Sequence, residues 1–291
     1  MRRIIVGVDG SEPAAQALLW AAEEAERHGA ELHAVLTWGL LDQHHPGGES
    51  RFEDDYDRDD AEEALDSYVK DALGAEPAVP VTLRPVNDLP ARGLMDAADD
   101  PEALLVLGAR GRGGFTGLLL GSVSQQCLHH SRCPVAVIRA GTPLVGHQPA
   151  RVVVGVDGSE VAQRALEWAA EEARVRGARL EVVHTWQIPY AGGYPYALGA
   201  PDLDQLEQAA RAGLDRILDR FDESGLAQPA ERIVTSGDPA AVLLDVGQGA
   251  DLVVLGSRGV GGFKGLLLGS TAHHVVHHAT CPVVVVPPQD R

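Results

Sequence analysis

Short apolar runs alternate with amphipathic stretches along this chain. Residues 3–8 and 103–107 are apolar runs of the length and composition expected of strands buried on both faces. After the first run, Ser11 is a favoured helix N-cap residue, and apolar side chains recur at helical spacing from Leu18 to Ala25. Alternating strands and helices of this kind predict a parallel α/β sheet with helices on both faces.

The pattern gives specific elements for the first half of the chain. Strands are expected at residues 3–8, 31–37, 81–86, 103–107 and 134–138. Helices are expected between Ser11 and Gly29, near 54–73, at 89–98 and near 122–130. The run of nine acids at 53–66 is expected on a solvated helix face and its entry loop. The second half repeats the same order.

An internal repeat explains this doubling. The sequence GVDGSE stands at residues 7–12 and again at 155–160, and all four tryptophans form two pairs at the same offset. GLLLGS at 117–122 likewise recurs at 265–270. We therefore predict two domains, residues 1–142 and 149–291, joined by the Gly/Pro-rich stretch at 141–149.

Composition narrows the classes of function. The 291 residues include 42 acids against 24 Lys and Arg, a net charge of -18, which disfavours a binder of nucleic acid or of an anionic membrane. No apolar run is long enough to span a bilayer, and Asp9 ends the first run too early for a secretory signal. Three scattered cysteines give no disulfide framework and are expected to be buried apolar residues. We expect a cytoplasmic protein.

The loop after the fourth predicted strand carries the strongest chemical signal. It reads GARGRGGFTGLLLGS at 108–122 and GSRGVGGFKGLLLGS at 256–270, so both copies fit Gly-x2-Gly-x9-Gly-Ser. Glycines let a ligand approach the backbone amides, and the helix that follows offers free N–H groups to an anion. Neither copy is a Walker A loop, because the Gly-Lys-Ser/Thr sequence is missing, and no G-x-G-x-x-G follows the first strand.

The chain resembles the universal stress protein family, in its tandem-domain, ATP-binding branch. Three features carry the resemblance: the two glycine loops, the Asp that ends the first strand of each half, and the Cys-Pro-Val sequence at the last strand of each half. The resemblance covers nearly the whole chain. It implies two doubly wound domains, each a five-stranded parallel sheet of order 3-2-1-4-5. It also implies ATP, with Mg²⁺ as a candidate companion ion, lying across the ends of strands one and four.

The resemblance further implies a set of binding residues in each half. In the first half they are Gly7, Val8, Asp9, Leu36, Gly108, Arg110, Gly111, Gly121, Ser122, Val123 and Ser124. In the second half they are Gly155, Val156, Asp157, His184, Gly256, Arg258, Gly259, Gly269, Ser270 and Thr271. The aspartates would contact the adenosine, Leu36 and His184 would lie near the adenine, and the glycines and serines would hold ribose and phosphates.

Other interpretations of these residues stay open at this stage. Asp9 and Asp157 are also good helix caps, and Arg110 and Arg258, favoured here as phosphate ligands, also suit a solvent-facing loop. The cluster HHxxHH at 273–278 has metal-compatible spacing, but no further ligand completes a set, so surface or interface histidines that titrate near neutral pH are the preferred interpretation.

The function that these features favour is a nucleotide-binding, stress-related regulator with an unidentified protein partner and no catalytic residues. A slow ATP hydrolase and a nucleotide-independent, chaperone-like dimer are the alternatives. A phospho-receiver is disfavoured because no acceptor Asp ends the third strand and no acidic pair follows the first. The two halves are expected to pair through their last strands, 134–138 and 282–286, and the whole chain to form a homodimer.

Overall fold

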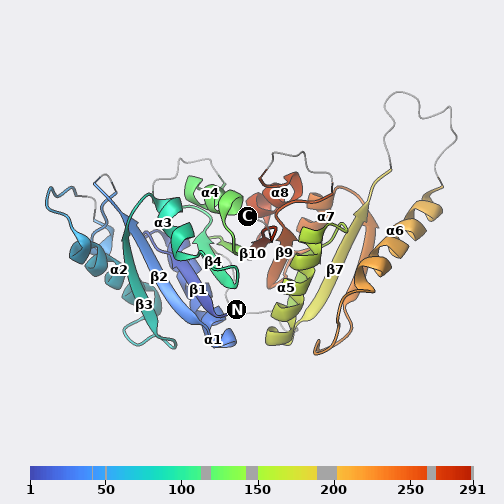
Figure 1. Ribbon diagram of the computed structural model, residues 1–291, viewed down its shortest axis with the longest axis horizontal. Coiled ribbons are helices and arrows are strands. Elements are labelled where there is room, and N and C mark those ends of the chain that lie inside the picture. The colour runs from blue at the N-terminus through green and yellow to red at the C-terminus, as the bar shows by residue number, and fades with distance from the viewer. Residues whose placement is uncertain are drawn as a thin grey trace, which may run out of the picture.

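The computed structural model describes residues 1–40, 42–49, 51–112, 119–141, 150–188, 202–260 and 267–289. Its strands form one ten-stranded sheet in the order β3-β2-β1-β4-β5-β10-β9-β6-β7-β8 (Figure 1). Within each half the order is 3-2-1-4-5 and every pairing is parallel, as the sequence predicts. The predicted doubly wound α/β architecture is confirmed.

The elements of the two halves follow one another in the same order. The first half contains β1 (Arg3–Gly7), α1 (Glu12–His28), β2 (Glu31–Trp38), the 3-10 turn η1 (Pro46–Gly48), α2 (Arg58–Leu73), β3 (Val81–Asn87), α3 (Pro90–Ala97), β4 (Ala103–Gly108), α4 (Ser122–His130) and β5 (Val135–Ile138). The second contains β6 (Arg151–Gly155), α5 (Glu160–Arg176), β7 (Arg179–Trp186), α6 (Leu203–Leu218), β8 (Glu231–Ser236), α7 (Pro239–Val246), β9 (Leu252–Gly256), α8 (Ser270–His278) and β10 (Val283–Val286).

The predicted helix near residues 54–73 begins later than expected. Asp57 is its N-cap residue, because its side chain accepts hydrogen bonds from the backbone of Asp59 and Asp60. Asp60 in turn accepts from the Asp57 amide, which completes a capping box. The acids before Asp57 therefore precede the helix, although their density resembles that of a solvated helix face.

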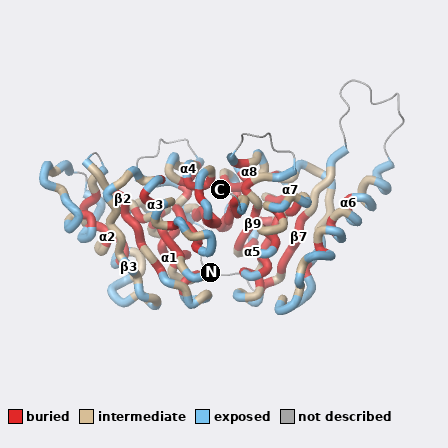
Figure 2. Tube along the Cα trace, in the orientation of Figure 1, coloured by how far each residue is buried: buried red, intermediate tan, exposed pale blue. Residues whose placement is uncertain are grey.

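Each face of the sheet has a core of its own, because successive strand residues point to opposite sides. Ile4 and Val6 of β1 pack in the core covered by α1, α2, α5 and α6. Ile5 packs in the other core, covered by α3, α4, α7 and α8. Both cores continue from one half into the other, and buried residues run through the middle of the molecule (Figure 2).

The two halves join through their last strands. β5 and β10 pair antiparallel, with Val284 opposite Ala136, which confirms the predicted pairing of these edges. The boundary residues 142 and 149 and nearly all of the predicted linker lie outside the described residues, so the two domain ranges stay predictions.

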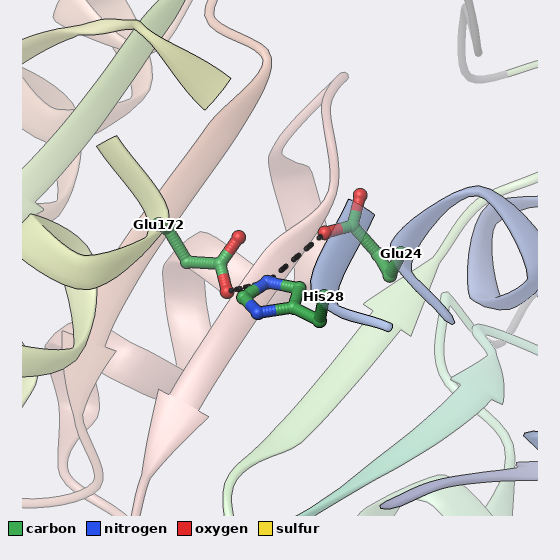
Figure 3. Close-up of side chains that lie close together, drawn as sticks. All are labelled: Glu24, His28 and Glu172. Carbon is green, nitrogen blue, oxygen red and sulfur yellow. Dashed lines mark ion pairs between the residues drawn. The ribbon is translucent and has the colours of Figure 1, made fainter. Parts of the chain in front are cut away.

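A buried group of charges also joins the halves, where α1 meets α5 (Figure 3). Arg176 Nη2 lies 2.6 Å from Glu24 Oε1, and Arg176 Nε lies 3.2 Å from Glu172 Oε2. His28 Nε2 lies 2.8 Å from Glu172 Oε1 and 3.9 Å from Glu24 Oε2. We call Glu24, His28, Glu172 and Arg176 the charge ring.

The charge ring follows the internal repeat. Glu24 and Glu172 are 148 positions apart, as are His28 and Arg176, so each helix contributes one acid and one base. Ligand atoms of Glu24, His28 and Glu172 lie within 4.8 Å of one another, as in a metal site. Arg176 already supplies a positive charge there, so the ring is electrically neutral once Glu24 holds a proton.

The charge ring makes stability depend on pH. Burial raises the pKa of Glu24 from about 4.5 to about 7, against the lowering effect of Arg176. Between these values the folded chain holds a proton that the unfolded chain has released, so this contribution to the free energy of unfolding is lost as pH rises from about 4.5 to 7. Glu24→Gln leaves a neutral ring without that proton.

We therefore expect the stability of the native chain, relative to Glu24→Gln, to fall by on the order of 1–3 kcal/mol between pH 5 and pH 7.5. Urea unfolding of both chains at intervals of half a pH unit measures the difference. A difference that is constant over this range would contradict the raised pKa.

Candidate functional site

The carboxyl ends of β1 and β4 open onto one cavity in the first half, with a volume of about 470 Å³. All of the predicted first-half residues except Leu36 line it, namely Gly7, Val8, Asp9, Gly108, Arg110, Gly111, Gly121, Ser122, Val123 and Ser124. Val35, Leu94, Leu107 and Leu120 supply apolar wall. A cavity of this size, apolar with a few polar groups at one side, suits a small-molecule ligand.

Asp9 fastens the loops on either side of the cavity to each other. Its Oδ1 accepts hydrogen bonds from the Ser11 amide at 3.0 Å and the Ser11 hydroxyl at 2.6 Å. Its Oδ2 accepts from the Arg112 amide at 2.9 Å. The N-cap residue of α1 is Ser11 rather than Asp9, so the interpretation of Asp9 as only a helix cap is wrong.

Two glycines of the loop have no room for a side chain. A Cβ on Gly108 would lie 2.7 Å from the backbone carbonyl carbon of Pro13 in α1. A Cβ on Gly111 would overlap Oδ2 of Asp9, the atom that holds the Arg112 amide. These positions keep the strand, the helix and the loop close together, which the sequence signal of spaced glycines predicts.

Gly121 begins α4 and leaves the start of this helix open. It is the N-cap residue, with φ of -76° and ψ of 156°, and within the described residues no side chain caps the first turn. The first amides of the helix therefore face the cavity with the positive end of the helix dipole. Ser124 has a structural role instead, because its hydroxyl donates a hydrogen bond to the Gly108 carbonyl at 2.8 Å and connects α4 to β4.

The second half repeats this arrangement around a cavity of about 680 Å³. The lining contains all of the predicted residues except His184, namely Gly155, Val156, Asp157, Gly256, Arg258, Gly259, Gly269, Ser270 and Thr271. Asp157 accepts from the amides of Ser159 at 3.0 Å and Val260 at 2.7 Å, and Ser159, not Asp157, caps α5. Gly269 begins α8 without a side-chain cap.

The prediction that Leu36 and His184 lie near the adenine needs correction, because neither residue lines the two cavities. Leu36 is fully buried in the core under α1 and α2. His184 bonds to the Val156 carbonyl at 2.9 Å and lines a separate cavity of about 1040 Å³ between α5 and α6. Both side chains point to the face opposite the ligand cavities, because residues adjacent in a strand face opposite sides.

Their strand neighbours line the cavities instead. Val35 and Thr37 flank Leu36 and reach the first cavity, and Val183 and Thr185 flank His184 and reach the second. The alternation of sides was visible in the sequence, but the face onto which the cavities open was not. The middle parts of both glycine loops, 113–118 and 261–266, lie outside the described residues.

The arginines of the loops are not equivalent. Within the described part of the chain, no ion pair or hydrogen bond engages the side chains of Arg110 and Arg258, which line matching cavities. Arg112 instead donates from Nη1 to the Tyr68 hydroxyl at 3.1 Å and from Nη2 to the Gly48 carbonyl at 3.2 Å. Among the described residues of the two loops, Arg110 and Arg258 are therefore cations available to a ligand.

The first cavity has an additional wall that the sequence did not reveal. Asp42 and His44 line it, with His44 Nε2 3.4 Å from Asp42 Oδ1. The hydrogen bond from His44 lowers the pKa of the Asp42 carboxyl below its usual value. Arg112 holds this segment in place, and Val260 stands at its position in the second half.

The histidine cluster behaves partly as predicted. His273, His274 and His278 are exposed on α8, but burial and the charges of neighbouring histidines and Arg139 lower the pKa of His277 to about 4. His277 therefore does not titrate near neutral pH.

The three cysteines are buried free thiols, and burial raises the pKa of each, to about 12 for Cys127 and about 11 for the other two.

Comparison with known proteins gives matches over nearly the whole chain. A model of the universal stress protein family matches residues 1–139 and again 150–287. The universal stress protein Rv2623 of Mycobacterium tuberculosis is 35% identical over 291 residues, which cover 97% of this chain and 95% of the relative. Rv2005c of the same organism is 33% identical over 290 residues, covering 97% and 96%.

A solved structure shows the same fold over the full length. The crystal structure of a universal stress protein from Archaeoglobus fulgidus matches with a TM-score of 0.63 and 23% identity, and the match covers 98% of each chain. None of the helices in the described residues is both long and apolar enough to span a membrane. On the two family matches and the near-full-length relatives, the chain belongs to the universal stress protein family.

Proposed function

We propose that each half binds one adenine nucleotide, with ATP as the first candidate, and that the protein is a nucleotide-dependent regulator in a stress response. One observation carries the proposal. In both halves a helix begins at a glycine, Gly121 or Gly269, without a side-chain cap from the described residues, and its first turn lines a cavity. An aspartate, Asp9 or Asp157, holds the neighbouring loop of each cavity in place through backbone amides. Such a helix start is a binding site for phosphate. ATP in particular comes from the family resemblance.

The cavity walls favour a nucleotide over a simple anion. Val35 and Leu94 offer apolar surface to a base or ribose, while Arg110 lies on the phosphate side with the start of α4. Both carboxylate oxygens of Asp9 already accept hydrogen bonds from the chain. We therefore expect Mg²⁺, if it accompanies the nucleotide, to be held mainly by the phosphate oxygens.

Substitution of Gly121 by Asp tests the first site. The backbone of Gly121 is in an ordinary region, and a Cβ there would have no neighbour closer than 3.5 Å, so the chain tolerates a side chain. Asp is a good N-cap residue, but its carboxylate occupies the amides and repels phosphate. We expect ATP affinity at this site to fall about 10- to 100-fold with an unchanged melting temperature.

Calorimetric titration of ATP into the native chain, Gly121→Asp, Gly269→Asp and the double variant measures both sites separately. Gly121→Asn is the matched control, because it caps the helix without the negative charge and should lose less affinity. Normal ATP affinity in a folded double variant would contradict the proposal. Absence of binding to the native chain at millimolar ATP would favour the nucleotide-independent dimer, and phosphate release during the titration would favour the slow hydrolase.

A further inference from the structure

We propose that His274 and His278 on α8 form a chelating site for a transition cation of the Ni²⁺, Cu²⁺ and Zn²⁺ series. The two imidazoles are one helical turn apart, and their ring centroids lie 4.5 Å from each other with an interplanar angle of 35°. Side chains four positions apart lie on the same helix face. Imidazole is the ligand that these cations accept most readily in proteins.

Both side chains are available for a metal. His274 and His278 are exposed, and within the described residues neither forms a hydrogen bond or an ion pair. Their contacts are with each other and, for His278, with the ring of His277 at 6.4 Å. Two imidazoles and solvent water make an open coordination sphere, and the net charge of -18 attracts cations to the molecule.

The neighbouring pair on the same helix is less suited to the cation. The rings of His273 and His277 are stacked at 4.2 Å, but His277 Nε2 is buried and has no hydrogen-bond partner among the described residues. Arg139 of the other half donates to the carbonyls of Val276 and His277 at the end of α8. This places a positive charge beside His277, so the exposed pair is the chelate.

Arg139 also helps to organise the site. By holding the carbonyls of the last helical turn, it fixes the part of α8 that carries His278. A chelate gains affinity when its ligands are held in place before the metal binds. The position that corresponds to Arg139 in the second half is Pro287, whose side chain has no donor that could make the same contact with α4.

The repeat supplies a built-in control. The positions of α4 that match His274 and His278 are Gln126 and His130, and both are exposed. The first half therefore has one of the two imidazoles on an equivalent helix. Gln126→His should build a second chelate there, and His274→Gln should convert α8 to the α4 arrangement.

Titration calorimetry with ZnCl₂ at pH 7.5, on the full chain freed of nucleotide, tests the proposal. We expect one Zn²⁺ per native chain, at least about tenfold weaker binding in His274→Gln and in His278→Gln, and two ions per chain in Gln126→His. His273→Gln should leave the affinity nearly unchanged. Far-ultraviolet circular dichroism of each variant shows whether it is folded.

Three results would overturn the proposal. The native chain would bind no Zn²⁺, or folded His274→Gln would bind it as well as the native chain, or His273→Gln would abolish the binding. Retention of the untagged native chain, but not of a folded His274→Gln/His278→Gln double variant, on immobilised Ni²⁺ would support it. Neither His274 nor His278 lines a nucleotide cavity, so ATP binding by the same variants distinguishes this test from that of the proposed function.

Discussion

Arg176→Met is expected to lower the free energy of unfolding by about 3–5 kcal/mol, because it leaves the buried carboxyl groups of Glu24 and Glu172 without the cation between them. The side chain of Arg176 is 7% exposed, and those of Glu24 and Glu172 are 0% and 2% exposed. With Arg176 gone, Glu172 keeps His28 as its partner and Glu24 keeps the partly exposed Arg27. Urea unfolding at pH 7 measures the loss.

Arg27→Met is the matched control for this substitution. Arg27 pairs with the same carboxylate, Glu24, at 2.9 Å, but its side chain is 33% exposed at the edge of the ring. An ion pair that solvent reaches contributes about 0–1 kcal/mol, so Arg27→Met should cost much less than Arg176→Met. Equal costs would mean that the charge ring does not stabilise the junction.

A double variant separates lost attraction from stranded charge. In Glu24→Gln/Arg176→Met only one carboxylate, Glu172, stays buried, and His28 lies 2.8 Å from it as a partner. We expect Arg176→Met to cost less in the Glu24→Gln background than in the native chain, by at least about 1 kcal/mol. Additive costs would contradict a coupled ring.

The order of elements could be predicted because each half consists of buried strands and amphipathic helices with strong local signals. Apolar runs marked the strands, and Ser11 and Gly29 marked the start and end of α1. The spaced glycines also predicted the loops that line the cavities. At Gly108 the end of β4 lies against the backbone of α1, and at Gly111 the loop lies against the carboxylate of Asp9. Neither position has room for a side chain, so the sequence shows a glycine at each.

The residues that the sequence did not reveal depend on which sides of the elements meet. Val35, not Leu36, reaches the cavity because α3 and α4 cover the face to which Val35 points. Asp42 and His44 come from the irregular segment between β2 and α2, which has no pattern to locate it. Local signals specify an element, while the facing of its side chains follows from the assembled sheet.

The charge ring shows the same limit at the junction of the halves. The sequence shows Glu24 and His28 four positions apart, with Glu172 and Arg176 repeating them, and ordinary helix-surface pairs look identical. Only the antiparallel pairing of β5 with β10 brings α1 against α5 and buries all four residues. The repetition of an acid and a base at matching helix positions in both halves is the sequence signal that could have suggested the charge ring.

Val284→Asp is expected to abolish the cooperative folding of the two halves as one unit. Val284 is fully buried at the centre of β10, opposite Ala136 of β5, and its side chain lies in the core that both halves share. A carboxylate there would lie among the apolar side chains of that core. Burial of an unpaired charge costs more than about 4 kcal/mol, which corresponds to a fall in melting temperature of roughly 10 °C or more.

Val284→Thr separates loss of apolar packing from charge. Threonine has nearly the shape of valine and brings a hydroxyl without a charge, so it should cost about 1–3 kcal/mol and keep a single transition. Scanning calorimetry and light scattering compare the three chains. Val284→Asp should show separate transitions or a changed scattering mass, because the antiparallel strand pair no longer holds the halves together. An unchanged melting curve with an unchanged mass would mean that other contacts, such as the charge ring, hold the halves without this strand pair.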